Sequence, residues 1–352
     1  MRHSNIYLLV TACLFTLCVL VHGSFGLQKK SRNLVIGYFW HRGRQYTEHY
    51  TSVRQNYKYI THLCPTRIAI KDTDGNVVSG KDKWLLAFGK QHGIAILPLV
   101  ANSDFSREIA HEVLNDESKR TKVINQLLEI ITEWKCPGIN IDIENVDPSD
   151  REAFNTFMKE LCDQFHKKGL AVTVDVPAKT KDVPTGYWSG AYDYKFLGKC
   201  CDLVMLMCYD EHWSTGKPGP IASRSWVRRC LEYATSTIPA HKVILGCAWY
   251  GYDWPEGGRA KAYTSKGIKD LIEERKPILQ WDNEAKSHWF EYTDNDGIKH
   301  TVWFEDPQSM AHKLHLAREF GIAGISIWRL GNEDPRYWDL LARYRAGHKI
   351  FK

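Results

Sequence analysis

The stretch Pro137-Gly-Ile-Asn-Ile-Asp-Ile-Glu144 alternates strictly between isoleucine and small or polar residues. Successive side chains of a β-strand point to opposite faces, so the pattern predicts a strand with Asn140, Asp142 and Glu144 in one row. Two arrangements are consistent with this strand. The polar row could face water, or it could line the inside of a closed barrel while the isoleucines pack beneath covering helices.

Runs of apolar, β-branched residues recur along the chain, separated by segments with helical periodicity. Strands are predicted at residues 34–40, 61–70, 94–100, 137–144, 171–176, 202–209, 243–250 and 322–328. Helices are predicted at residues 46–59, 83–92, 107–134, 148–168, 225–237 and 307–320. Strands alternating with helices indicate an α/β fold with parallel strands, and eight such units indicate a (β/α)8 TIM barrel. The alternative is an open doubly wound sheet, but no GxGxxG motif or P-loop marks a dinucleotide site.

The interval between the last two predicted strands, residues 251–321, is the longest in the chain. Within it, residues 281–304 alternate between apolar and polar around Asp294-Asn-Asp-Gly297, a turn sequence typical of a hairpin. The interval therefore predicts a small α+β insertion between strands seven and eight, at about residues 252–305. Such barrels carry their active sites at the C-terminal face, where this insertion would deepen a cleft.

The N-terminus has the features of a targeting segment. Arg2 and His3 precede an apolar run at residues 6–21, which small residues follow. This predicts a secretory signal at residues 1–26, cleaved after Gly23 or Gly26, and a barrel domain at residues 27–352. An uncleaved signal anchor is the alternative, although the run is shorter than the roughly 20 residues of a bilayer span. We therefore expect a secreted, extracellular protein, or alternatively a lysosomal one, that leaves the membrane after cleavage.

The amino-acid composition limits the classes of ligand and cofactor that the protein is expected to bind. The 352 residues are 43% hydrophobic and 25% charged, with a net charge of +6 and no dense basic run, so a nucleic-acid ligand is not expected. Eight of the ten cysteines follow the signal segment, and an even number in an exported protein predicts disulfides. Cys208 and Cys247 lie in predicted strands and are expected to be buried thiols. No metal-binding spacing occurs, so we expect no metal and no cofactor, and we expect a monomer.

Asp142 and Glu144 are the residues most suited to acid–base chemistry. They are two positions apart on one strand face, which places their Cα atoms roughly 6.6 Å apart. Inside a barrel both carboxyls would be partly desolvated, and two such carboxyls resist ionising together. One of them therefore keeps its proton near neutral pH, as a general acid must. Glu144 is favoured because it is nearest to the C-terminal end of the strand.

Four segments give the chain a resemblance to glycoside hydrolase family 18, the chitinase family, over nearly all of the sequence after the signal. They are residues 137–144 (family pattern DGxDxDxE), Met207-Cys-Tyr-Asp210 (MxYD), Trp249-Tyr-Gly251 and Ile325-Ser-Ile-Trp328. Gly138, Asp142 and Glu144 match the first pattern. Pro137 and Asn140 replace its first two aspartates. The Asn variant resembles the branch that contains di-N-acetylchitobiase, the spore-cortex N-acetylglucosaminidases and chitinase-domain-containing proteins.

The resemblance implies a retaining glycosidase that cleaves β-linked N-acetylglucosamine-containing glycans, of the chitooligosaccharide or chitobiose type, by substrate-assisted catalysis. Glu144 would be the general acid and base. Asp142 would orient the acetamide group of the substrate, with Asn140 behind it, and Tyr209 would donate its hydroxyl to the acetamide oxygen.

The same resemblance implies further contacts with the glycan. Asp210 and Tyr38 would bond sugar or acetamide groups, and Trp328 would stack beneath the sugar. Tyr250 and Trp213 complete the predicted binding set. Packing roles remain open for these aromatic residues, in the core or against the insertion. A chitinase-like lectin that binds such glycans without cleaving them is the alternative function, although lectins of this family typically lack the glutamate that Glu144 matches.

Overall fold

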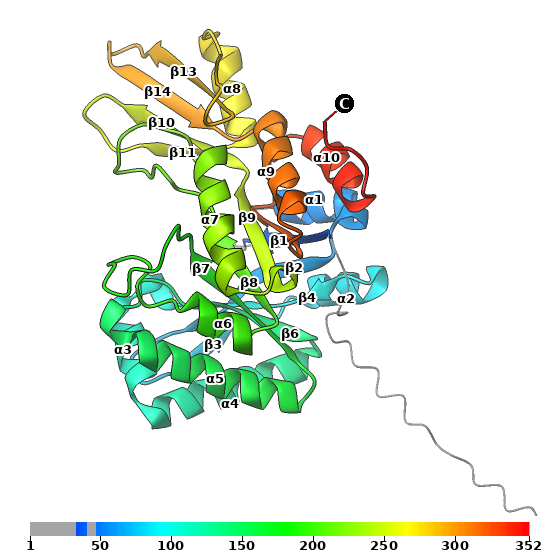
Figure 1. Cartoon of the computed structure of the whole chain (residues 1–352). Coiled ribbons are helices and arrows are strands. Elements are labelled where there is room, and N and C mark those ends of the chain that lie inside the picture. Colours follow the sequence, from blue (N-terminus) through cyan, green and yellow to red (C-terminus); the bar gives the residue numbers. More distant parts are fainter. Residues whose placement is uncertain (1–32, 41–46, 352) are drawn as a thin grey trace, which may run out of the picture.

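The computed structural model describes residues 33–40 and 47–351, and its central element is a closed ring of eight parallel strands (Figure 1). They are β1 (Leu34–Phe39), β2 (His62–Ile70), β5 (Leu99–Asn102), β6 (Gly138–Asp142), β7 (Ala171–Pro177), β8 (Leu203–Met207), β9 (Val243–Ala248) and β15 (Gly324–Trp328). Their order is β1-β15-β9-β8-β7-β6-β5-β2, and β1 pairs with β2 to close the ring. The predicted TIM barrel is confirmed, and the open sheet is wrong.

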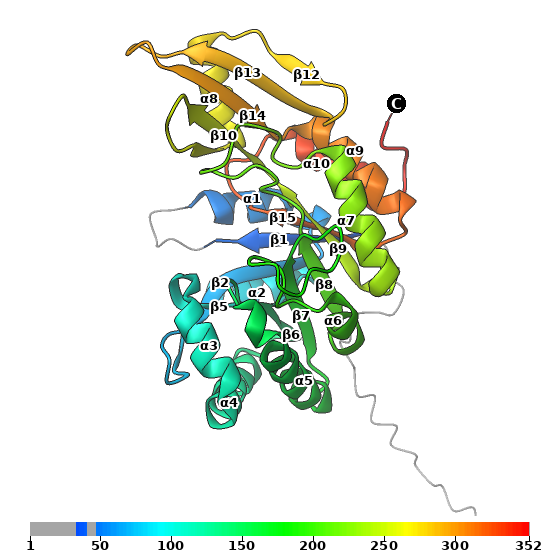
Figure 2. The ribbon, with the colours of Figure 1, turned by 60° about the vertical axis from the view of Figure 1, so that its left-hand side comes forward.

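Helices cover the outside of this ring (Figure 2). They are α1 (Glu48–Asn56), α2 (Lys83–His92), α3 (Arg107–Asn115), α4 (Glu117–Trp134), α5 (Arg151–Lys167), α6 (Tyr194–Cys200), α7 (Arg224–Thr237), α9 (Pro307–Glu319) and α10 (Arg336–Arg345). Several begin after a residue whose side chain accepts a hydrogen bond from the first turn, as Asp82, Ser106 and Ser223 do. The helices α6 and α10 have no counterpart among the predicted helices.

Short elements join these helices and strands. The strands β3 (Val77–Ser79) and β4 (Ala95–Ile96) both pair with β2. Single turns of 3-10 helix occur at η1 (Tyr57–Tyr59), η2 (Ser103–Phe105), η3 (Pro148–Asp150) and η4 (Ala240–Lys242). Within the described ranges, no helix is both long and apolar enough to cross a membrane. The predicted signal segment lies outside those ranges.

The strand β6 is buried at every position. Ile139 and Ile141 belong to the large apolar cluster shared by the strands and the outer helices. Gly138 is required by the close approach of β7, because a Cβ atom there would lie 2.3 Å from the Ala171 carbonyl oxygen. The polar row of β6 therefore faces the inside of the barrel, and the water-facing arrangement is wrong.

The predicted α+β insertion between the last two barrel strands is confirmed. It contains β10 (Tyr250–Pro255), β11 (Lys261–Thr264), α8 (Ser265–Arg275), β12 (Gln280–Asp282), β13 (Ser287–Thr293) and β14 (Lys299–Phe304). The strands form an antiparallel sheet in the order β11-β10-β14-β13-β12. Ile268 and Leu271 of α8 pack on Phe290, Val302 and Phe304 of the sheet. Figures 1 and 2 both show this sheet at one end of the molecule, next to α7.

The predicted disulfides are not formed. All eight cysteines from Cys64 to Cys247 lie in described segments and are free thiols. Most occupy small apolar positions: Cys64 lies inside the barrel, and Cys208 and Cys247 are fully buried as predicted. A cysteine that fills a core position in this way packs against apolar neighbours. The even number of cysteines therefore did not indicate disulfides in this chain.

Candidate active site

The predicted site residues come from the C-terminal ends of five barrel strands or just beyond them. Glu144 follows β6 by two residues, and Tyr209 and Asp210 follow β8. Trp328 is the last residue of β15, Tyr38 is the last residue but one of β1, and Tyr250 begins β10 two residues after the end of β9. This end of a TIM barrel is where active sites are built.

A hydrogen-bonded chain crosses the interior at the level of Asn140. Thr173 Oγ1 donates to Asn140 Oδ1 at 2.6 Å, and Asn140 Nδ2 donates to Asp175 Oδ2 at 2.6 Å. The Tyr38 hydroxyl donates to the other oxygen of Asp175. Because β1 and β7 lie on opposite sides of the ring, the contact between Tyr38 and Asp175 spans the barrel.

Asp175 was missed by the sequence prediction. It is 3% exposed on β7, and it is the one charged residue of the run Ala171-Val-Thr-Val-Asp-Val176. An aspartate in a strand that is buried on both faces was a signal that could have pointed to the site, since a buried carboxylate needs donors.

Asp142 and Glu144 lie in a desolvated, acidic setting. Burial, and then the charge of Asp175, raise the pKa of Asp142 well above its ordinary value. Asp142 Oδ1 is buried and finds no hydrogen-bond partner among the described residues. Burial, followed by the charges of Asp142 and Asp210, raises the pKa of Glu144 to about 8. At neutral pH the Glu144 carboxyl therefore holds its proton.

The backbone at Glu144 is held by a reciprocal pair of hydrogen bonds. The Glu144 N–H donates to Asn102 Oδ1, and Asn102 Nδ2 donates to the Glu144 carbonyl oxygen, both at 3.0 Å. Asn102 is the last residue of β5 and is 1% exposed. Its amide therefore positions the chain just beyond β6 without contacting the carboxyl group of Glu144.

Beyond the end of β8, Asp210 is held by two phenols. The Tyr250 hydroxyl donates to Asp210 Oδ1, and the Tyr252 hydroxyl lies 3.4 Å from Asp210 Oδ2. Burial raises the pKa of Asp210, whereas these two hydrogen bonds lower it. Tyr209 is half-buried, and burial together with the nearby carboxylates raises the pKa of its hydroxyl well above the ordinary value. Tyr209 thus remains a donor at any physiological pH.

Two predicted aromatic residues are placed differently. Trp328 is half-buried and meets Tyr38 edge to face, with ring centroids 5.4 Å apart. Trp213 is 56% exposed in the loop after β8, and its indole N–H donates to Thr215 Oγ1 at 2.8 Å. The structure therefore brings Tyr38 and Trp328 into contact, while Trp213 lies in an exposed loop that begins at Asp210.

Comparison with known proteins identifies the family to which these site residues belong. The model of glycosyl hydrolases family 18 matches residues 35–333. The chain belongs to glycoside hydrolase family 18. It is a glycosidase, and the resemblance noted in the sequence is confirmed.

Relatives of this glycosidase cover most of its length. An uncharacterized glycosylase, YvbX of Bacillus subtilis (strain 168), is 31% identical over 304 residues, which are 84% of this chain and 88% of the relative. The cortical fragment-lytic enzyme of the same organism is 31% identical over 321 residues, or 88% of this chain and 74% of the relative. Di-N-acetylchitobiase of Homo sapiens is 26% identical over 246 residues, or 60% and 62% of the two chains.

Solved structures agree with these relatives. The spore cortex-lytic enzyme SleL of Bacillus megaterium superposes with a TM-score of 0.81 at 30% identity, covering 89% of this chain and 74% of that one. A chitinase of Chromobacterium violaceum superposes with a TM-score of 0.82 at 29% identity, covering 89% and 99%. Both likenesses extend over the barrel and the insertion of this glycosidase.

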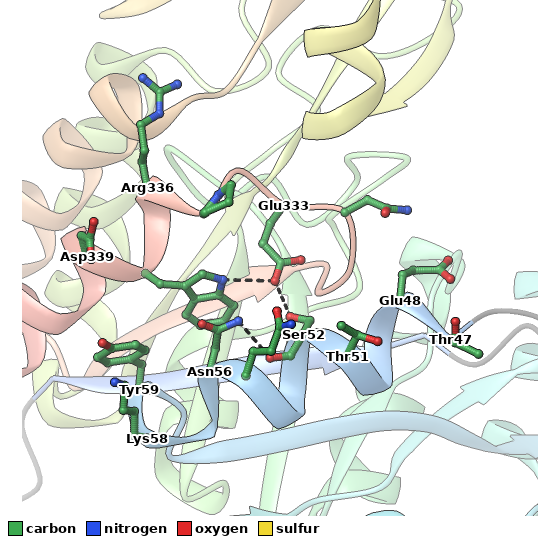
Figure 3. Close-up of a pocket in the computed structure, with 14 residues that line it drawn as sticks. Thr47, Glu48, Thr51, Ser52, Asn56, Lys58, Tyr59, Glu333, Arg336 and Asp339 are labelled. Atoms are coloured by element: carbon green, nitrogen blue, oxygen red, sulfur yellow. Dashed lines mark hydrogen bonds between the residues drawn. The ribbon is translucent and has the colours of Figure 1, made fainter.

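A separate groove of about 660 Å³ lies on the outside of the glycosidase barrel (Figure 3). Its lining comes from α1, η1, α10 and the segment that leads into α10, whereas the site residues come from the barrel strands or just beyond them. Glu333 accepts hydrogen bonds from the Ser52 hydroxyl and from the Trp338 indole N–H, which ties the two walls together. The groove thus lies between α1 and α10 and contains none of the predicted site residues.

One cluster in the described part of this glycosidase offers three sulfur ligands. The Sγ atoms of Cys162, Cys200 and Cys201 lie within 4.8 Å of one another, between α5 and α6. A structural zinc site uses four ligands, so these thiols are one short of that set. They also lie among apolar neighbours of the large outer core, and not among the cleft residues.

Proposed function

We propose that this glycosidase cleaves β-linked N-acetylglucosamine-containing glycans with retention of configuration, using the acetamide group of the substrate as nucleophile. The observation that carries the proposal is Glu144, a carboxyl with a pKa of about 8 beside a second buried acid, Asp142. A retaining enzyme with two independent carboxylates would need one of them ionised as the nucleophile. Here Glu144 holds its proton at neutral pH, and burial raises the pKa of Asp142 as well, which favours an attacking group supplied by the substrate.

The proposed steps are those that the family resemblance implies for these side chains. The Glu144 carboxyl transfers its proton to the glycosidic oxygen as the bond from C1 to that oxygen breaks. The acetamide oxygen attacks C1 from the opposite face and forms a cyclic oxazolinium ion. Asp142 accepts the acetamide N–H, and Tyr209 donates its hydroxyl to the acetamide oxygen. Water then attacks C1 as the bond from C1 to the acetamide oxygen breaks and restores the acetamide group, while the Glu144 carboxylate takes the proton of the water, so that two inversions give net retention.

The binding residues have matching roles in this proposal. Trp328 presents an indole face to the apolar face of the sugar at the reacting position. Asp210 would accept from a sugar hydroxyl, and Tyr250, whose hydroxyl hydrogen goes to Asp210, would accept from another. Tyr38 contributes through Asp175, because its hydroxyl already donates to that carboxylate.

The names of the relatives support the substrate class. A cortical fragment-lytic enzyme and a di-N-acetylchitobiase are both similar to this chain over 60% or more of its length. The predicted signal segment supports action outside the cytoplasm. Expression of the full chain with a C-terminal epitope would distinguish secretion into the medium from delivery to the lysosome.

The test is hydrolysis of chitooligosaccharides and of soluble peptidoglycan fragments by the purified protein, with the first product anomer followed by NMR. We expect the β-anomer to appear first, no cleavage of N-deacetylated oligomers, and inhibition by a thiazoline analogue of the oxazolinium ion. An initial α-anomer would contradict retention. Equal cleavage of deacetylated substrate would contradict participation of the acetamide group. Binding of glycan without any turnover would favour the lectin function.

A further inference from the structure

Asn140 stands where the family pattern has an aspartate, and the neighbouring strand supplies a carboxylate in its place. Asn140 Nδ2 lies 2.6 Å from Asp175 Oδ2, and both side chains are buried, at 0% and 3% exposure. The pairing of β6 with β7 places Ile141 opposite Val174. Asp142 and Asp175 are the next residues of the two strands, so the two acids lie side by side.

The hydrogen bonds around Asp175 define where the charge of this pair belongs. Both Asp175 oxygens accept a hydrogen bond, one from Tyr38 and one from Asn140. Thr173 donates to the side-chain carbonyl oxygen of Asn140, which fixes the amide so that its NH2 group must face Asp175. Asp142 Oδ1, by contrast, has no donor among the described residues. The donors therefore favour a carboxylate at Asp175 and a proton on Asp142.

The titratable groups that face Asp175 are acids, phenols and a thiol. They are Tyr38 from β1, Cys64 from β2, Asp142 and Glu144 from the β6 segment, and Tyr209 beyond β8. Burial raises the pKa of Asp175 to about 7, and the hydrogen bonds from Tyr38 and Asn140 oppose that rise. The charge that Asp175 carries is thus stabilised by neutral donors.

We propose that Asp175 is a positioning residue of this glycosidase and supplies, from β7, the carboxylate that position 140 lacks. Asp175 thereby orients Asn140 and Tyr38, and it holds one negative charge beside Asp142. Asp175 makes no contact with the glycan in this role. It acts through Asp142, whose carboxyl group would turn to the acetamide N–H of the substrate. Asp142 and Asp175 together would then carry one negative charge, which balances the positive charge of the oxazolinium ion. The inference rests on the proposed function and assigns it a residue outside the family pattern.

The test compares Asp175→Asn with the exchange variant Asn140→Asp/Asp175→Asn. In Asp175→Asn the remaining charge must reside on Asp142, whose Oδ1 lacks a donor among the described residues, so the acid that has to ionise becomes weaker. We expect kcat to fall by about 10²-fold and the acidic limb of the pH–rate profile to move to higher pH. In the exchange variant the new carboxylate accepts from Thr173 and from the amide introduced on β7, so the acidic limb should return toward its wild-type position, with at least tenfold recovery of kcat.

Asp253→Asn is the matched control. Asp253 is also a buried aspartate that accepts from a tyrosine, Tyr292 at 2.7 Å, but it lies in the insertion sheet next to His300. This variant should unfold at lower temperature while its pH–rate profile keeps the wild-type limbs. A purely structural role for Asp175 would produce the same result as Asp253→Asn, namely lower stability with unmoved limbs, and that outcome overturns the inference.

The folding of the variants and the activity of the wild type also test the role of Asp175. If Asp175→Asn does not fold, the exchange variant should still fold and turn over, because it restores the pair across the two strands. Failure of the exchange variant to turn over would overturn the inference. If the wild-type protein itself releases no sugar from any glycan of the class, then the proposed function fails. If the wild type is active and Asp175→Asn is equally active, then only the inference about Asp175 fails.

Discussion

Replacing Glu144 by glutamine removes the one proton that the proposed reaction must deliver, while it preserves the size of the side chain. The amide cannot protonate a glycosidic oxygen, and it cannot later activate water. Loss of a general acid and base costs roughly 10²–10⁴-fold in rate. We therefore expect Glu144→Gln to bind chitooligosaccharides and to release sugar at least about 100-fold more slowly than the wild type.

The structure also gives the pH at which this proton is available. With a pKa of about 8, Glu144 is about nine-tenths protonated at pH 7. With an ordinary pKa of 4.5 it would be protonated in only about 0.3% of the molecules, so the environment raises the competent fraction roughly 300-fold. The alkaline limb of kcat/KM should consequently lie near pH 8 in the wild type.

The same shift has a consequence for stability. The folded-state pKa of Glu144 lies above its unfolded value, so the native protein binds more protons than the unfolded chain between about pH 4.5 and pH 8. Unfolding free energy therefore falls as the pH rises through that window. Glu144→Gln carries no such penalty and should be more stable than the wild type at pH 9, with an upper limit of about 5 kcal/mol that solvent screening of this half-buried group reduces.

Initial rates on chitooligosaccharides between pH 4 and pH 10, together with thermal unfolding over the same range, measure both effects. Glu305→Gln is the matched control, because Glu305 is a fully buried glutamate paired with Lys313 at 2.7 Å and lies outside the cleft. It should lose stability and keep the pH dependence of its activity. Release of sugar by Glu144→Gln at the wild-type rate would refute the assignment of Glu144 as the acid.

Three further predictions concern residues around Glu144. Asp210→Asn removes a charge that raises the pKa of Glu144, so the alkaline limb should move to lower pH by about half a unit to one unit; an unmoved limb would show that Asp210 acts through sugar contacts alone. Trp328→Ala should raise KM by about tenfold, equivalent to about 1.4 kcal/mol of lost stacking, with a smaller change in kcat; titration calorimetry with a chitooligosaccharide checks it. Gly138→Ala should lower the unfolding free energy by roughly 1–3 kcal/mol, because its methyl group would strike the Ala171 carbonyl oxygen, and chemical denaturation measures this.

The barrel could be predicted from the sequence because its periodicities are local. The isoleucines of the stretch at residues 137–144 and the lengths of the intervening helical segments are visible without any knowledge of the pairing. The hairpin around Asp294 to Gly297 follows equally from a short turn signal, and β13 and β14 flank it in the structure. Such features depend on neighbours a few residues away in the chain.

The partners of Asn140 could not be predicted in this way. Its contact with Asp175 depends on the register between β6 and β7, and its link to Tyr38 depends on closure of the whole ring. The disulfide prediction failed for a related reason. A count of cysteines holds no information on whether thiols such as those of Cys64 and Cys230 face one another or face the core.

The buried acids Asp175 and Asp210 accept hydrogen bonds from uncharged donors, which fits the chemistry proposed for Glu144. Asp175 accepts from a phenol and an amide, and Asp210 accepts from two phenols. A lysine or arginine at those places would stabilise the carboxylates more strongly, but its charge would also lower the pKa of Glu144 and remove the proton at neutral pH. Neutral donors hold each neighbouring acid in position without that effect. The site thus keeps several carboxyls close together with neutral donors, and the loss of stability that this causes accompanies the raised pKa of Glu144.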